Sequence, residues 1–215
     1  MMLSRYLIVC GCLLFSAGCI YNDEPMPKID HDYSSRAFQR RPLLPAKSVQ
    51  HKDENVPASW LPPSDLEKKW LAIVIHHSGT KNGSAAVFDQ WHKEGNHWEG
   101  VGYDFVIGNG TDSADGQVEA TYRWRNQKIG AHCGGTAGNW ANKEAIGVCL
   151  VGNFNQTIPT ARQMEAVTKL VKFLQDRYGI PKSRIYGHNT TPGARPTDCP
   201  GRYFSIVELR SKTGF

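Results

Sequence analysis

The stretch "KWLAIVIHHS" (residues 69–78) decides the fold, because it is a continuous apolar run rich in β-branched residues. Such a run predicts a strand, over residues 70–76, that is buried on both faces of a sheet. A second run, "EAIGVCLVGNF" (144–154), predicts another buried strand over residues 145–151. Strands of this kind are covered by helices on both sides, which favours an α/β arrangement.

Helical patterns alternate with these strands. The clearest is "TARQMEAVTKLVKFLQDRYG" (160–179), which has an apolar stripe at helical spacing, a capping box of Thr160 and Gln163, and a C-terminal cap at Gly179. A shorter helix is expected from about residue 84 to 95, and its apolar face includes Trp91.

The remaining elements are short. They are a strand in "GYDFVIGNG" (102–110), its hairpin neighbour "GQVEATYRW" (116–124), a strand in "RIYGH" (184–188) and a final helix in "YFSIVELR" (203–210). Because helices and apolar strands alternate, the predicted fold class is α/β, with a central mixed β-sheet flanked by helices.

Length and composition indicate one globular domain. The chain has 215 residues, 40% of them hydrophobic, which is enough to build a real core, and we expect a monomer. The formal charge of +5 is spread along the chain and forms no basic run, so we expect no nucleic-acid partner. A mildly cationic surface of this kind suits an anionic polymer or a membrane surface.

The N-terminus "MMLSRYLIVCGCLLFSAGC" (1–19) has the pattern of a secretory signal, with one basic residue, an apolar run and small residues before Cys19. The ending resembles a bacterial lipobox, which predicts a signal peptide over residues 1–18 and lipidation of Cys19. A plain cleaved signal or an uncleaved anchor are the alternatives. Residues 19–63 are polar and Pro-rich, which is typical of a tether, and residues 64–215 form the predicted domain. The chain is therefore expected to be exported and lipid-anchored to a membrane of the bacterial cell envelope.

Three residues have the chemistry of a metal site. His76 and His188 each end a predicted strand, and Cys199 follows in the loop "GHNTTPGARPTDCPGRYF" (187–204). Loops at strand ends are where α/β sheets build their sites, and a catalytic zinc needs three protein ligands and one open position. Strand-end histidines are also common as hydrogen-bonded loop residues, so the pattern alone leaves both interpretations open.

Five motifs in register carry a resemblance to a known family. They are "IVIHHSGT" (73–80), "GVGYDFVIG" (100–108), "IGAHCGG" (129–135), "AIGVCLVGNF" (145–154) and the cysteine loop. Together they resemble the zinc N-acetylmuramoyl-L-alanine amidases, a group that includes amidase-type phage lysozymes and peptidoglycan recognition proteins. The resemblance implies the fold of that group, His76, His188 and Cys199 as Zn²⁺ ligands, and Tyr103 and Thr197 as catalytic residues.

Other residues are candidates for substrate contact. His132 is expected on a loop near the cleft, Trp140 along the groove, and Arg195 opposite a peptide carboxylate through its bidentate fork. A structural loop role is the alternative for each of them. His77 is adjacent to His76 in a strand and is therefore expected on the opposite face, packed or hydrogen-bonded.

Two further cysteines lie inside the domain. Cys133 and Cys149 could form a disulfide in an oxidising compartment, but Cys149 lies within an apolar strand, which favours a buried free thiol. Some relatives carry a glutamate at the position of Cys149, so the resemblance implies that Tyr103 and Thr197 provide more of the proton chemistry.

The resemblance implies a peptidoglycan hydrolase that cleaves the amide between N-acetylmuramic acid and L-alanine through a zinc-activated water. Its partners would be peptidoglycan or muropeptide fragments and, through Cys19, a membrane. One alternative is a recognition module that binds muropeptides without cutting them. Another is a cysteine hydrolase with Cys199 as nucleophile and His188 as base. A lysozyme-type glycosidase would need two flanking carboxylates, and the motif loops hold no such pair.

Overall fold

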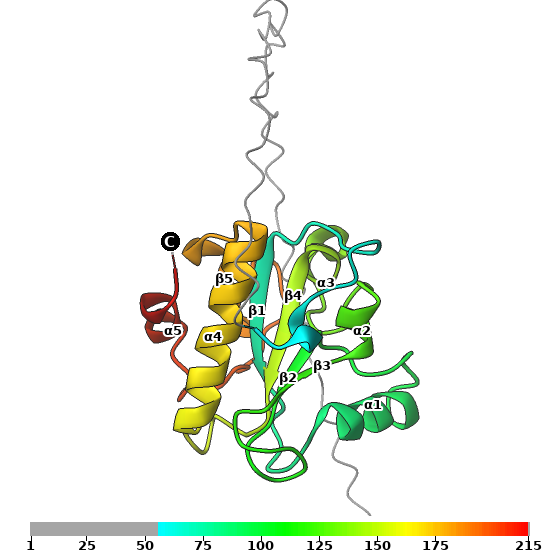
Figure 1. Cartoon of the computed structure of the whole chain (residues 1–215). Helices are drawn as coiled ribbons and strands as arrows, with labels where there is room; N and C mark the ends of the chain where they lie inside the picture. Colours follow the sequence, from blue (N-terminus) through cyan, green and yellow to red (C-terminus); the bar gives the residue numbers. More distant parts are fainter. Residues whose placement is uncertain (1–55, 215) are drawn as a thin grey trace, which may run out of the picture. The chain divides into compact units, whose positions relative to one another are not determined.

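The computed structural model describes residues 56–214, which form a mixed β-sheet with helices on both faces (Figure 1). The predicted signal peptide, Cys19 and most of the tether lie outside these residues. The strands are β1 (Ala72–His77), β2 (Phe105–Ile107), β3 (Val118–Ala120), β4 (Ala145–Leu150) and β5 (Ile185–Gly187). The helices are α1 (Ala85–Glu94), α2 (Tyr122–Arg125), α3 (Trp140–Glu144), α4 (Ala161–Tyr178) and α5 (Ile206–Lys212).

The strand order is β3-β2-β4-β1-β5, so the two continuous apolar runs of the sequence become the neighbouring strands β1 and β4. β1 is parallel to both β4 and β5, and β2 is parallel to β4. Only β3 is antiparallel, as the hairpin partner of β2. The predicted α/β fold with a central mixed sheet is confirmed.

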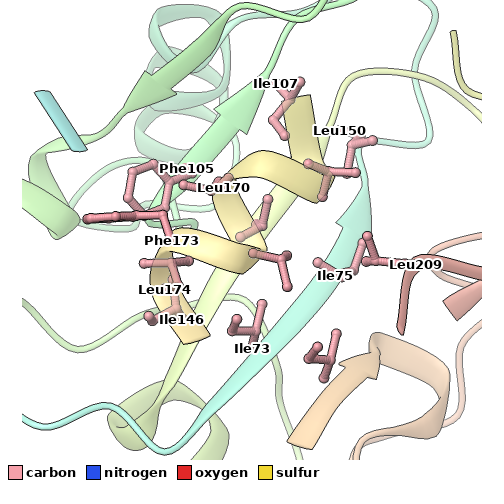
Figure 2. Close-up of a cluster of buried hydrophobic side chains, with 14 of the residues drawn as sticks. Ile73, Ile75, Phe105, Ile107, Ile146, Leu150, Leu170, Phe173, Leu174 and Leu209 are labelled. Carbon is pink, nitrogen blue, oxygen red and sulfur yellow. The ribbon is translucent and has the colours of Figure 1, made fainter. Parts of the chain in front are cut away.

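One face of the sheet is covered by α4 and α5. Figure 2 shows Ile73 and Ile75 of β1 and Ile146 of β4 beneath Leu170 and Leu174 of α4. The predicted capping box of α4 is present, and Gly179 adopts a left-handed conformation (φ 66°) at its C-terminus. The periodic stripe of α4 therefore supplies most of the helical side of the main core.

The opposite face is covered by α1 and α3. Phe88 of α1 packs on Val106 and Cys149, and α3 lies against β4 and β1. Trp91, expected on the buried face of α1, is 46% exposed, because Phe88 fills the space above the sheet instead.

Two short helices were not predicted. The expected strand over 116–124 ends at Ala120, because the Thr121 side chain accepts a hydrogen bond from Arg123 N–H and begins α2. The Gly-rich segment "GGTAGNWANKE" (134–144), which its composition predicts to be a loop, contains α3, which begins directly after Asn139 in a left-handed conformation (φ 61°).

The end of the predicted tether belongs to the packed domain. A 3₁₀ turn, Ala58–Trp60, places the Trp60 ring in the main core, where it is 4% exposed. Its carbonyl accepts a hydrogen bond from the indole of Trp124 at 3.0 Å. Within residues 56–214, no helix has the length and apolar character that crossing a bilayer requires.

Candidate metal centre

His76 reaches the site because strand side chains alternate between faces. In β1, Ile73 and Ile75 face α4, so His76 faces the opposite layer, where it is 1% exposed. His77 points back to the α4 side, and its Nδ1 accepts a hydrogen bond from the N–H of Phe154 at 3.0 Å. The expectation that His77 is a hydrogen-bonded residue of the other face is confirmed.

His188 lies beside His76 through strand pairing. β5 pairs with β1 so that Gly187 is opposite Ile75, and the residues that follow these two, His188 and His76, therefore lie at the same level. The imidazole rings of His76 and His188 are therefore neighbours, with centroids 4.7 Å apart. His188 remains half-buried, which leaves one side of this pair open.

The loop after His188 returns Cys199 to the same place. Asn189 N–H donates to the Cys199 carbonyl at 2.8 Å, which closes the loop. Thr197 Oγ1 accepts a hydrogen bond from Cys199 N–H at 3.1 Å, and Cys199 Sγ accepts one from His77 N–H at 3.3 Å. These contacts hold the thiol against β1.

The three predicted ligands converge, since one donor atom from each of His76, His188 and Cys199 lies within 4.8 Å of the other two. Tetrahedral zinc binds nitrogen at about 2.0–2.1 Å and sulfur at about 2.3 Å, which separates a nitrogen from a sulfur ligand by about 3.6 Å. His76 Nδ1 and Cys199 Sγ are 3.6 Å apart. The residues therefore fit a zinc ion, and their role as ligands stays a prediction.

The electrostatics of the three groups agree with this fit. Burial, followed by the neighbouring His132 and His188, holds the pKa of His76 well below its usual range, and burial also lowers the pKa of His188. Both imidazoles are thus neutral, with a lone pair to offer. Burial raises the pKa of the Cys199 thiol to about 12, so a metal must displace its proton on binding.

Tyr103 lies next to the cluster, with its ring centroid 5.2 Å from that of His76. Burial, followed by the thiols of Cys149 and Cys199, raises the pKa of Tyr103 well above its usual range. The phenol is therefore protonated at neutral pH. Cys133 and Cys149 are both buried free thiols, which confirms the preferred interpretation of these cysteines.

A cavity of about 390 Å³ adjoins the cluster at His188. Of the predicted residues, Thr197, Arg195 and His132 line it, whereas Trp140 does not. The Trp140 indole instead donates to the carbonyl of Pro192 at 3.2 Å and packs against Tyr186, which supports the outer part of the cysteine loop.

Trp98 also lines this cavity, and sequence reasoning missed it. Its side chain is 43% exposed, and its ring packs on His92 with centroids 4.9 Å apart. The residue lies in an irregular segment after α1, where no periodicity marks a buried or a binding face. The sequence offers one signal, a tryptophan among polar residues and glycines in "GNHWEG" (95–100).

A cluster of two histidines and a cysteine lies at the carboxyl edge of parallel strands, beside a cavity, and is the candidate metal centre of this α/β domain. The family model of N-acetylmuramoyl-L-alanine amidases matches residues 66–202. The chain belongs to this family.

Individual relatives include enzymes and recognition proteins. Peptidoglycan-recognition protein SC2 of Drosophila melanogaster is 33% identical over 137 residues, which are 60% of this chain and 66% of that protein. The N-acetylmuramoyl-L-alanine amidase of Homo sapiens is 31% identical over 114 residues, 52% of this chain but 17% of the human protein. A function related to peptidoglycan is common to these relatives and to the family.

Solved structures agree with the fold. The N-acetylmuramoyl-L-alanine amidase LysC from Clostridium intestinale has a TM-score of 0.55 and 30% identity, covering 65% of this chain and 82% of that one. The Ph2119 endolysin of a Thermus scotoductus bacteriophage has a TM-score of 0.54 at 22% identity, covering 69% and 88%, and supports the fold alone.

Proposed function

We propose that this chain is a zinc-dependent peptidoglycan amidase that cleaves the amide between the lactyl group of N-acetylmuramic acid and L-alanine. The convergence of the three candidate ligands carries the proposal. The ligand set of His76, His188 and Cys199 is complete, its Nδ1–Sγ separation of 3.6 Å suits tetrahedral zinc, and one side adjoins a cavity. The family and the amidase LysC support the same reaction.

Zinc bound here would supply Lewis acidity to the amide carbonyl and to a water nucleophile. The chain's own residues would supply the hydrogen bonds. The Tyr103 phenol stays protonated, so it donates to the developing oxyanion. The Thr197 hydroxyl oxygen accepts a hydrogen bond from Cys199 N–H, so its own O–H can donate a second hydrogen bond to the oxyanion. Arg195 at the cavity rim offers two donors to a carboxylate of the stem peptide.

A cysteine hydrolase is disfavoured by the electrostatics of the thiol. A nucleophilic cysteine needs a pKa lowered by nearby positive charge. Burial instead raises the pKa of Cys199 to about 12, and the neighbouring histidines are neutral. A recognition module without activity would not need three converging donors, so the complete ligand set favours cutting.

We also propose that the protein acts in the cell envelope, exported by the signal over residues 1–18 and lipid-anchored through Cys19. This proposal rests on the sequence of the N-terminus. Mass spectrometry of the mature protein should show a diacylglyceryl-type modification on Cys19. An unmodified N-terminus elsewhere, or absence of the protein from the membrane fraction, would leave a simple secreted enzyme.

Digestion of purified muropeptides, followed by mass spectrometry of the products, tests the proposed reaction. The wild-type chain should release L-alanyl peptides, lose this activity with a chelator and regain it with added zinc. Cys199→Ser should hold little zinc and release almost no product. Cys133→Ser is the matched control, because this thiol is outside the ligand set, and it should hold about one zinc per chain, as a single three-ligand site requires. Full activity of Cys199→Ser would refute the ligand assignment.

A further inference from the structure

The two ring nitrogens of His76 face different partners. Nδ1 lies 3.6 Å from Cys199 Sγ, on the side of the ligand cluster. Nε2 lies 3.1 Å from Nδ1 of His132, and the two rings meet edge to face with centroids 5.0 Å apart. Only Nδ1 of His76 is therefore directed at the candidate metal position.

The carbonyl oxygen of Ala145 determines which ring nitrogen of His132 carries a hydrogen, and thereby which ring nitrogen of His76 does. Nε2 of His132 is 3.3 Å from this oxygen, which can only accept, so Nε2 of His132 is the protonated nitrogen. The neutral ring then has a lone pair on Nδ1, which accepts from Nε2–H of His76. This leaves the lone pair of His76 on Nδ1, where a metal ligand needs it.

The ring of His132 is fixed in place by its surroundings. Asn142 Oδ1 accepts hydrogen bonds from the backbone N–H groups of His132 and Cys133, both at 2.9 Å. Two glycines make room for the imidazole, because a Cβ on Gly130 or on Gly147 would lie 2.5 Å from its Cδ2 atom. The residue is 7% exposed.

We propose that His132 is a positioning residue, which fixes the tautomer and the orientation of His76 through a histidine–histidine–carbonyl chain of hydrogen bonds ending at Ala145. Both nitrogens of His132 are engaged inside the protein, so contact with substrate, which the sequence predicts for this residue, would involve carbon atoms only. The proposal rests on the proposed metal site for its consequence, which is tighter zinc binding. Partners of this kind typically contribute a factor of about 10–100 to metal affinity.

The hydrogen-bond chain itself can be tested without metal. Long-range ¹H–¹⁵N correlation spectra of the wild-type chain should show protonated Nε2 on both His76 and His132. Addition of zinc should shift Nδ1 of His76 and leave both Nε2 protons in place. A proton on Nδ1 of His132 would overturn the proposal whether or not the protein binds zinc.

Substitutions test the consequence for the metal. His132→Leu removes the acceptor, whereas His132→Asn places Oδ1 near the former position of Nδ1 and keeps it. Chelator competition should give roughly 10–100-fold weaker zinc binding for His132→Leu, and most of this loss should be recovered in His132→Asn. Equal affinities for wild type and His132→Leu would overturn the proposal.

Gly147→Ala supplies a second perturbation that leaves the histidine unchanged. Its Cβ would lie 2.5–2.9 Å from three ring atoms of His132 and would force the ring to move. Zinc affinity should fall in this variant as it does in His132→Leu. If the wild-type chain itself bound no zinc, the proposed function would fail, while the tautomer measurement would still decide on the hydrogen-bond chain.

Discussion

Replacing Tyr103 by phenylalanine removes one hydroxyl and leaves the ring. The ring packs beside His76 and His92, with centroid distances of 5.2 and 5.9 Å, and phenylalanine preserves both contacts. The lost group is a phenol whose pKa is raised by burial, which makes it a hydrogen-bond donor and excludes it as a base at neutral pH. The substitution therefore tests the donor alone.

The expected loss is that of one oxyanion donor. Removing such a donor lowers kcat by about 10²–10³, which corresponds to about 2.7–4 kcal/mol. Zinc content should stay near one per chain, because Tyr103 is not among the three converging donors.

Steady-state release of L-alanyl peptides, measured alongside metal content, gives both quantities. Tyr122→Phe is a matched control, because its buried hydroxyl has no hydrogen-bond partner and lies in α2, outside the ligand cluster. It should keep wild-type turnover. Near wild-type turnover of Tyr103→Phe with bound zinc would refute the donor role and direct attention to Asp198, which carries the carboxyl group of the cysteine loop.

Three further predictions concern the hydroxyl of Thr197, the thiol of Cys199 and the buried carboxyl of Asp104. Thr197→Ala should lower kcat roughly 10-fold, because a hydroxyl dipole contributes less than a charged donor; an unchanged kcat would limit Thr197 to holding Cys199 N–H. Zinc binding at pH 6.5 should release about one proton, because the Cys199 thiol, whose pKa is about 12, must ionise to bind the metal; zinc affinity should therefore weaken as pH falls. Calorimetry in buffers of different ionisation enthalpy measures the number of protons released, and a value of zero would contradict the prediction. Burial raises the pKa of Asp104 from 3.8 to about 7, so the folded state holds a proton that the unfolded state loses, and the unfolding free energy should fall by up to about 4 kcal/mol as pH rises from about 4 to 7. Asp104→Asn keeps an acceptor for Gly147 N–H and should flatten this slope in urea unfolding; an equally steep slope in the variant would exclude Asp104 as its source.

The long elements and the three metal-ligand candidates could be predicted because their signals are local. The capping box of Thr160 and Gln163 and the glycine at 179 mark the ends of α4 in the sequence itself. The apolar runs mark β1 and β4, and the alternation of strand faces separates His76 from His77. These features depend on residues that are close in the sequence, so they can be predicted without knowledge of the tertiary fold.

The features that were missed depend on tertiary contacts. Trp91 satisfies the helical pattern as well as Phe88 does, and only the position of α1 over β2 and β4 decides that Phe88 is buried. Helix α3 has five residues and follows a left-handed Asn139, so its sequence carries little periodicity. His132 looks like an ordinary loop histidine until the fold brings it to His76, 56 positions earlier in the chain.

The register of β1 links the core to the metal site. Because side chains alternate along a strand, a slip of one residue would turn His77 toward the site and His76 into the apolar layer under α4. The slip would also move Ile73 and Ile75 out of the layer that holds Leu170 and Leu174. Both faces of β1 are buried, so the displaced side chains would be misfitted in the other layer, and the close packing under α4 opposes the slip. The positions of His76 beside His188 and of its Nδ1 beside Cys199 are therefore fixed by the packing of the opposite face, which explains why a few loop contacts are sufficient to complete the site.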